Sequence, residues 1–262
     1  MSVAPVSREL SRPARFARAR LILHLLRGML VLRTVYRRAD AAGRQAHVRV
    51  WSQRLLALCG VTLRVHLHGE VLASGALVVS NHVSWLDIQV IDAWRPTPFV
   101  AKAEIEGWPL VGWLVKSAGT IFIRRERRSD ARRVVEQLAG VLAAEGLICV
   151  FAEGTTSDGR SVAPFHANLM QAAVTAGVPV QPLCVMYEDA SGRQSMAPAF
   201  VGDMSFGASV RQVLAGAPLI AHLHVGEPLR DLTDRRTAAA SAHAAVAAAL
   251  AALQAGVHPA RD

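Results

Sequence analysis

The sequence predicts a single layered α/β domain, in which helices flank a mixed central sheet. Two observations lead to this fold class. Short apolar or alternating runs, which are typical of strands, recur along the chain with helical segments between them. A chain of 262 residues also buries a sizeable core without needing several domains. An N-terminal amphipathic helical arm at residues 1–50 is expected to precede the folded body at residues 51–262.

The expected strands and helices follow one another in order. Residues 61–68 alternate between apolar and polar side chains, which predicts a half-exposed strand, and residues 76–80 form an apolar run typical of a buried one. A helix is expected from Ser84 to about Trp94, because Pro96 stops it. The later expected elements are a strand at 99–101, a helix at 107–117, a strand at 120–123, a helix at 124–145, a strand at 147–151, a helix at 165–176, strands at 178–187 and 222–225, and a helix at 237–255.

The net charge of +9 is concentrated at the N-terminus. Residues 1–50 contain eleven arginines against Glu9 and Asp40, whereas the rest of the chain is neutral. A basic arm on a neutral body indicates attraction to a polyanion, either anionic lipid or nucleic acid. Nucleic acid is disfavoured, because aromatic residues make up only 5% of the chain and no recognised binding module is present.

Residues 21–32 form the most apolar stretch of the arm, although they include His24 and Arg27. Twelve helical residues cover about 18 Å, which is less than the roughly 30 Å hydrocarbon core of a membrane. Arg20, His24 and Arg27 are expected on one helical face, which favours an interfacial helix with arginines near lipid head groups. A secretory signal and a helix that caps the core are the alternatives. The side chains expected on the opposite face are Ile22, Leu25, Leu26 and Met29.

Cysteine and histidine usage argues against a disulfide scaffold or a metal site. Cys59, Cys149 and Cys184 lie in apolar surroundings, which indicates buried thiols in a reducing compartment. His222 and His224 share a strand face, but no cysteine or carboxylate stands at ligand spacing. We therefore expect neither a metal nor a cofactor.

The segment Asn-His-Val-Ser-Trp-Leu-Asp at 81–87 carries the clearest chemical signal. A histidine with a nearby carboxylate can take a proton from a hydroxyl group near neutral pH. Five residues of an ideal helix turn through about 500°, so His82 and Asp87 cannot meet if both are helical. They can meet if His82 lies in the turn after the strand and Asp87 in the first helical turn. The alternative is that Asp87 only caps the helix, with Ser84 as N-cap.

Three further motifs accompany this segment in order: Gly-Thr-Ile-Phe-Ile-Arg-Arg at 119–125, Phe-Ala-Glu-Gly-Thr-Thr-Ser at 151–157 and Val-Pro-Val-Gln-Pro at 178–182. Over about residues 64–187 the sequence resembles the glycerolipid acyltransferase family, of the lysophosphatidic acid acyltransferase type. The resemblance implies that His82 is the general base and that Asp87 orients its ring. It also implies that Arg125 binds phosphate, with Arg124 in place of the acidic residue more usual there.

The same resemblance makes Glu153 and Gly154 part of an acceptor-binding loop, together with Thr155 and Thr156. Two positions depart from the family pattern. Ala152 replaces a usual proline, and Thr156 replaces a common phosphate-binding arginine. Threonine at this position also occurs in relatives that act on lyso-ornithine lipid, so the acceptor's head group stays open.

The function expected from the resemblance is O-acyl transfer from acyl-CoA or acyl-carrier protein to a lysophospholipid. The first choice of acceptor is 1-acyl-sn-glycerol-3-phosphate, which would give phosphatidic acid. Asn81 and Lys102 are also expected to contact substrate, Lys102 as a donor to the oxyanion. The body at 51–262 would be the catalytic domain, at an anionic surface on the cytoplasmic face of the inner membrane. The alternatives are a lyso-ornithine lipid acyltransferase and a non-enzymatic lipid-binding protein.

Overall fold

The computed structural model describes residues 12–107, 112, 116, 119–123 and 128–256. Within them, the main sheet has five strands, and it is parallel except between β6 and β7. A smaller parallel pair continues it, because Phe99 bridges Cys149 at the edge of the main sheet. In spatial order the main strands are β1 (Val61–Leu67), β7 (Leu219–Val225), β6 (Val180–Glu188), β2 (Ala76–Ser80) and β5 (Leu147–Phe151); the smaller pair is β3 (Val100–Lys102) and β4 (Ile121–Ile123).

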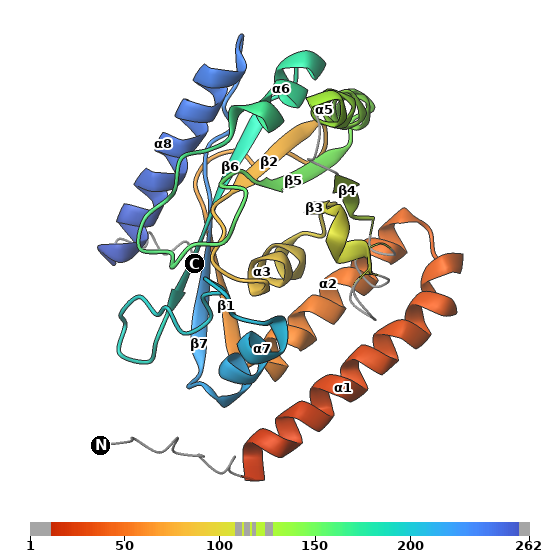
Figure 1. The fold of residues 1–262 in the computed structure, drawn as a ribbon, viewed down its shortest axis with the longest axis vertical. Helices are drawn as coiled ribbons and strands as arrows, with labels where there is room; N and C mark the ends of the chain where they lie inside the picture. Colours follow the sequence, from red (N-terminus) through yellow and green to blue (C-terminus); the bar gives the residue numbers. More distant parts are fainter. Residues whose placement is uncertain (1–11, 108–111, 113–115, 117–118, 124–127, 257–262) are drawn as a thin grey trace.

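Helices cover both faces of this sheet, which gives three layers (Figure 1). One face packs against α5 (Arg128–Ala143), α6 (Ala167–Ala176) and α8 (Arg235–Gln254). The other packs against α1 (Arg12–Arg33), α2 (Ala41–Leu58), α3 (Leu86–Trp94) and α7 (Phe206–Ala215). Two short 3-10 helices, η1 (Tyr36–Arg38) and η2 (Ala103–Gly107), complete the elements with described bounds.

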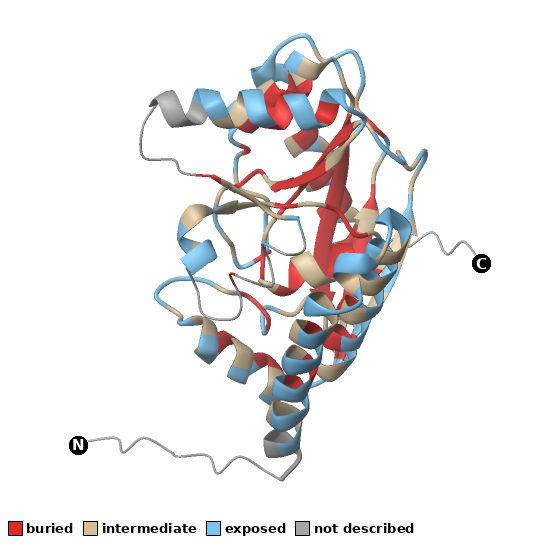
Figure 2. Ribbon diagram, turned by 90° about the vertical axis from the view of Figure 1, so that its right-hand side faces the viewer, coloured by how far each residue is buried: buried red, intermediate tan, exposed pale blue. Residues whose placement is uncertain are grey.

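The sequence of β2 explains its central position. Its five residues are all buried, as expected for a strand covered on both faces. Leu77 and Val79 point into the core under α5, α6 and α8, whereas Val78 points towards α3. Because side chains alternate along a strand, one apolar run supplies both cores. Figure 2 shows the buried residues gathered in the sheet and on the helix faces turned towards it.

The expected layered α/β fold with a mixed central sheet is confirmed, but two helices were not anticipated. No separate element was expected at α2 or α7, because their apolar residues are interspersed with arginine, serine and glutamine. Asp40 caps α2 by accepting from the backbone N–H of Gly43 at 2.8 Å. This helix runs through residue 50, so the expected domain boundary falls inside it. Most of the helix expected at 107–117 lies outside the described residues.

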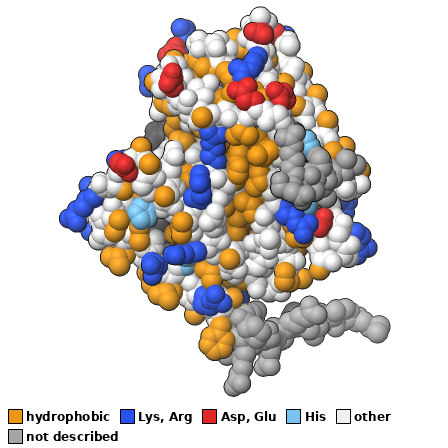
Figure 3. All heavy atoms as spheres, turned by 180° about the vertical axis from the view of Figure 1, so that it is seen from behind, with side chains coloured by type: hydrophobic (Ala, Val, Ile, Leu, Met, Phe, Trp, Pro, Cys, Tyr) orange, Lys and Arg blue, Asp and Glu red, His pale blue; other side chains and the backbone are white. Residues whose placement is uncertain are grey.

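Helix α1 faces the protein with a narrow strip of its surface. Leu21 and His24 are buried, and His24 stacks on Trp51 of α2 with its Nε2 atom 3.1 Å from the Trp51 carbonyl oxygen. Of the three residues expected on one helical face, His24 therefore packs against the protein, whereas Arg20 and Arg27 are exposed. In the view from behind, apolar and basic side chains lie intermixed along the lower left, where α1 and α2 lie (Figure 3). The large apolar side chains that α1 exposes are Phe16, Ile22, Leu23, Leu26 and Leu30.

Helix α8 is the one described helix with enough length and apolar character to cross a membrane. Its residues Ala242, Val246 and Leu250 are buried against the sheet and α6. We therefore assign α8 to the core of the domain, where the sequence analysis placed it as a packing element.

Candidate active site

The residues of the candidate site gather at one edge of the sheet, where three neighbouring parallel strands end. His82 follows β2, Glu153 follows β5, and Tyr187 is the penultimate residue of β6. The carboxyl ends of parallel strands are the usual place for ligands in open α/β sheets. Chain segments far apart in the sequence therefore meet here because of the strand order alone.

His82 and Asp87 form the contact that the sequence analysis expected. His82 Nδ1 lies 2.8 Å from Asp87 Oδ2. The histidine lies in the irregular segment after β2, and Asp87 lies in the first turn of α3. Asn81 fixes the start of this segment, because its side-chain amide donates to the Val185 carbonyl at 2.9 Å and accepts from the Val185 N–H at 2.8 Å.

The carboxylate of Asp87 is also a cap, so the two alternatives from the sequence occur together. Its Oδ2 atom accepts from the backbone N–H groups of Val83 at 2.7 Å and Ser84 at 2.9 Å. The helix itself begins two residues later than expected, at Leu86, and the Ser84 hydroxyl accepts from the Leu86 N–H at 3.3 Å. Since Asp87 is fully buried, these donors offset the cost of removing its charge from water.

The ring of His82 is held on one side and remains partly open. Phe151 stacks on it with ring centroids 3.8 Å apart and planes 8° apart. The side chain of His82 is 18% exposed. Because Nδ1 faces Asp87, the Nε2 atom on the other side of the ring is the one available to a substrate hydroxyl. This is the arrangement of a general base with an orienting carboxylate.

Glu153 holds the backbone around His82. Its Oε1 atom accepts from the His82 N–H at 2.7 Å, and its Oε2 atom accepts from the Ala163 N–H at 3.0 Å. Burial raises the pKa of Glu153, and these two hydrogen bonds act in the opposite direction. Both carboxylate oxygens are therefore engaged by the main chain, although the sequence analysis expected this residue to bind substrate.

The rest of the expected acceptor loop also packs on the histidine segment. Gly154 has a φ of +74°, which favours glycine, and Thr155 is exposed. The Thr156 hydroxyl donates to the Phe200 carbonyl. Ser157 donates to the His82 carbonyl twice, from its N–H at 2.8 Å and from its hydroxyl at 3.3 Å. The loop thus fixes both the N–H and the C=O of His82.

Three of the expected substrate-binding side chains lie outside the described part of the structure. Lys102 ends β3, where its backbone pairs with Ile123, but its side chain is among those not described. Arg124 and Arg125 directly follow β4 and are outside the described residues altogether. Their expected roles therefore stay predictions.

Tyr187 is a site residue that the sequence analysis missed. Its hydroxyl donates to Asp87 Oδ1 at 2.7 Å, and the residue is 1% exposed. It shares a strand face with Leu183 and Val185, both of which pack towards α3. A buried tyrosine usually requires a partner for its hydroxyl, and this was the signal that the sequence offered.

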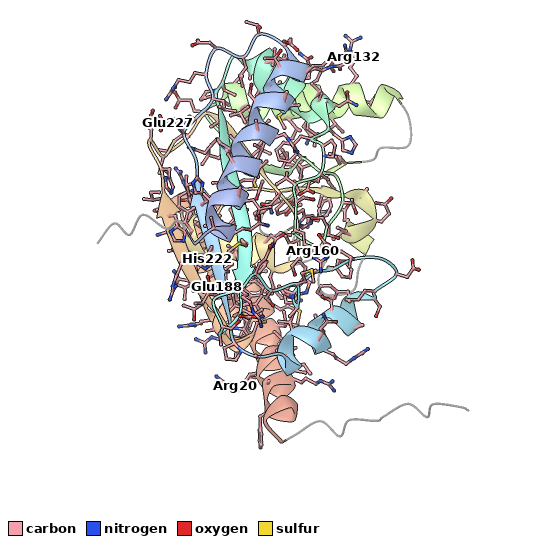
Figure 4. The ribbon with its side chains drawn as sticks, turned by 90° about the vertical axis from the view of Figure 1, so that its left-hand side faces the viewer. Arg20, Arg132, Arg160, Glu188, His222 and Glu227 are labelled. Atoms are coloured by element: carbon pink, nitrogen blue, oxygen red, sulfur yellow. The ribbon has the colours of Figure 1, made fainter. Side chains whose placement is uncertain are left out.

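A second histidine–carboxylate pair lies elsewhere. His222 Nε2 is 3.2 Å from Glu188 Oε2, and Figure 4 shows these two residues close together. His222 Nδ1 is 2.9 Å from His66 Nε2. Among the residues that the structure describes, no group of three histidine, cysteine or acidic side chains is arranged to hold a metal ion.

The fold and the site together define a class: an α/β enzyme with a histidine–aspartate dyad at the carboxyl edge of its sheet. Comparison with known proteins narrows this class. The family model described as Acyltransferase matches residues 63–186. The chain is 38% identical over 208 residues to a lyso-ornithine lipid O-acyltransferase of Pseudomonas aeruginosa, and the match covers 79% of each chain. The protein therefore belongs to the glycerolipid acyltransferase family and is an acyltransferase.

Other relatives carry a second acceptor in their names. A 1-acyl-sn-glycerol-3-phosphate acyltransferase of Neisseria meningitidis is 36% identical over 146 residues, which is 56% of this chain and 57% of that one. The crystal structure of the 1-acyl-sn-glycerophosphate acyltransferase PlsC from Thermotoga maritima has the same fold. It superposes with a TM-score of 0.63 and 19% identity over 91% of this chain and 98% of that one.

Proposed function

We propose that this protein moves a fatty acyl group from a thioester, acyl-CoA or acyl-carrier protein, to the free hydroxyl group of a lysolipid. The single observation behind this proposal is the His82–Asp87 pair, in which Nδ1 lies 2.8 Å from the carboxylate while the histidine side chain is 18% exposed. His82 would take the proton of the acceptor hydroxyl as its oxygen attacks the thioester carbonyl carbon. Collapse of the tetrahedral intermediate would break the C–S bond, and the imidazolium would return the proton to the thiolate. An ester and a free thiol result.

We propose lyso-ornithine lipid as the acceptor. The longer match, to the P. aeruginosa enzyme, supports this choice. Thr156 takes the place where an arginine is common in phosphate-using relatives, and its hydroxyl is engaged by the Phe200 carbonyl. The same loop continues to Asp158 and Arg160, whose charged groups are 3.8 Å apart and exposed. Opposite charges suit a zwitterionic head group better than a phosphate dianion. This choice reverses the order expected from the sequence.

Lysophosphatidic acid is the second candidate, and one observation favours it. Arg124 and Arg125 directly follow β4, and two adjacent guanidinium groups suit a phosphate.

An acceptor panel separates the two candidates. Purified protein in vesicles would receive one acyl thioester and either lysolipid, with His82→Ala as the background. Turnover on lyso-ornithine lipid is expected to exceed turnover on lysophosphatidic acid by about tenfold or more, the discrimination that roughly 1.4 kcal/mol provides. The reverse ratio would establish the second candidate. Repeating the assay with acyl-CoA and with acyl-carrier protein identifies the donor.

The expected role of the arm is also a proposal: α1 lies in the membrane interface. Its exposed side combines Leu23 and Leu26 with Arg20 and Arg27. An apolar stripe bordered by arginines matches the boundary between acyl chains and anionic head groups. Leu23 is 67% exposed, so its side chain has no protein core to enter. This geometry would bring the catalytic edge to lipid substrates on the cytoplasmic face of the inner membrane.

Sedimentation with anionic vesicles tests this arrangement. The double substitution Leu23→Glu and Leu26→Glu is expected to weaken binding at least tenfold, since burying each leucine contributes about 1.5–3 kcal/mol. Val141→Glu, at an exposed apolar residue of α5, serves as the matched control. Wild-type binding by the double variant would rule out α1 as the docking helix.

A further inference from the structure

Asp87 accepts hydrogen bonds at both of its oxygens. The histidine and two backbone N–H groups share Oδ2, whereas the Tyr187 hydroxyl donates to Oδ1 at 2.7 Å. The Tyr187 hydrogen bond spans 100 residues of sequence and joins β6 to the first turn of α3. It fixes the carboxylate plane from the side opposite the histidine.

We propose that Tyr187 is a positioning residue for the dyad, and that its hydrogen bond sets both the orientation and the basicity of the Asp87 carboxylate. The inference rests on the proposed acyl transfer. Tyr187 would not touch substrate, because it is 1% exposed. Its effect would pass through Asp87 to His82.

The tyrosine can donate at any working pH. Burial raises the pKa of Tyr187 well above its ordinary value, and the charge of Asp87 raises it further. The phenol therefore stays protonated and keeps its donor. A hydrogen bond to a charged acceptor is stronger than one between neutral groups, so its loss changes the carboxylate more than an ordinary buried contact would.

Few other titratable groups near Tyr187 and Asp87 could alter the pH profile of the reaction. Burial raises the pKa of Cys59 to about 12, and it also raises the pKa values of Cys149 and Cys184, so these thiols stay neutral. Burial raises the pKa of Glu153, and Asp92 is a further acidic group close to Cys149. The pH profile must therefore be compared between variants that differ only at Tyr187.

Tyr187→Phe removes the donor and keeps the ring. Without it, the Oδ1 charge is less stabilised and attracts the imidazolium proton more strongly. The acid limb of the kcat/KM profile is expected to move to higher pH by about half a unit to one unit. The plateau kcat should fall about tenfold because the ring is less well oriented. The KM values for donor and acceptor should not change.

Ser209→Ala is the matched control. It removes the 3.1 Å hydrogen bond from the Trp85 indole to a buried serine hydroxyl on the same side of the sheet, without touching Asp87. A merely structural role for Tyr187 would lower stability in both variants and leave both pH profiles in place. That result would overturn the inference.

A second measurement is available if Tyr187→Phe does not fold. The chain has two tyrosines, Tyr36 and Tyr187, so 3-fluorotyrosine incorporated into a Tyr36→Phe protein labels Tyr187 alone. The fluorinated phenol is a stronger acid and a better donor. The acid limb is then expected to move to lower pH, opposite to the phenylalanine variant.

The two proposals fail in different ways. If His82→Ala keeps full activity, the proposed function is wrong. If His82→Ala is inactive while the profile of the fluorinated enzyme superposes on that of its Tyr36→Phe parent, the role of Tyr187 alone is excluded.

Discussion

Among the described residues, two histidine–carboxylate pairs lie at the sheet, and they differ in how far the histidine is exposed to solvent rather than in composition. His82 and Asp87 lie 2.8 Å apart on the face that packs against α3, and the histidine keeps 18% of its side-chain surface exposed. His222 and Glu188 lie 3.2 Å apart, and His222 is fully buried. Because side chains alternate along β6, Glu188 points to the same face of the sheet as Met186, which packs towards α8. The two pairs therefore lie on opposite faces of the sheet.

The comparison teaches that a close histidine and carboxylate do not make a general base. At His222 both ring nitrogens face protein groups, Nδ1 towards His66 and Nε2 towards Glu188. At His82, Nδ1 faces Asp87, and Nε2 has no protein partner among the residues that the structure describes. The partly exposed ring of His82 therefore fits the proposed role of a general base, whereas the buried His222 links its strand to that of Glu188.

The largest effect should come from His82→Ala. Losing the base is expected to reduce kcat by about 10³-fold or more, within the range for general-base catalysis. The fold should persist, because Asp87 keeps its three other donors. Initial rates alongside urea unfolding would measure both quantities. Retained activity with an intact fold would show that His82, like His222, is not a general base.

Asp92 sharpens the comparison. Asp87 has four hydrogen-bond partners, whereas the buried carboxyl group of Asp92 has one among the described residues, the Thr97 N–H. Burial raises the pKa of Asp92 to about 8. An acid whose pKa is raised on folding stabilises the protein at low pH, and this contribution is lost as the pH rises from about 4 to about 8. The free energy of unfolding should fall by up to about 1.4 kcal/mol per pH unit there.

Asp92→Asn is expected to flatten that dependence, because asparagine stays neutral and keeps an acceptor for Thr97. Thermal unfolding of both proteins between pH 5 and 8 provides the measurement. Parallel curves for the two proteins would show that Asp92 is ionised in the folded state throughout.

The smallest effect is expected for His222→Phe. The variant should lose about 1 kcal/mol of stability, since Glu188 keeps some contact with water after its partner is removed. Its kcat should stay within about threefold of the wild-type value, because the pair lies on the opposite face of the sheet from the His82–Asp87 pair. A loss of activity comparable to that of His82→Ala, without unfolding, would make the second pair functional.

The sequence predicted the fold and the dyad well, and for the same reason. Short apolar runs such as residues 76–80 and 147–151 mark central parallel strands directly, and a histidine just after such a strand must lie at its carboxyl end. Helix α2 escaped prediction because its outer face is basic and its apolar face is sparse. The arginines of residues 1–50 then led to the prediction of a separate basic arm that ends at residue 50.

The supporting contacts were harder to predict, because they join distant parts of the chain. Nothing local in the sequence states that Glu153 binds the backbone of His82, or that Tyr187 reaches Asp87. Both follow from the order of β5, β2 and β6 in the sheet. Motif matching therefore gives the residues of such a site but not which of them face the substrate.

Helix α2 also has a practical consequence for truncated forms of the protein. The first half of α2 lies within the expected arm at residues 1–50, and its second half places Leu55 and Leu56 in the core. A protein shortened to begin at residue 51 would lose the Asp40 cap and half of the helix, and would then expose core leucines and aggregate. A version that starts a few residues before Asp40 keeps the helix whole. Such a version also removes the exposed apolar side chains of α1.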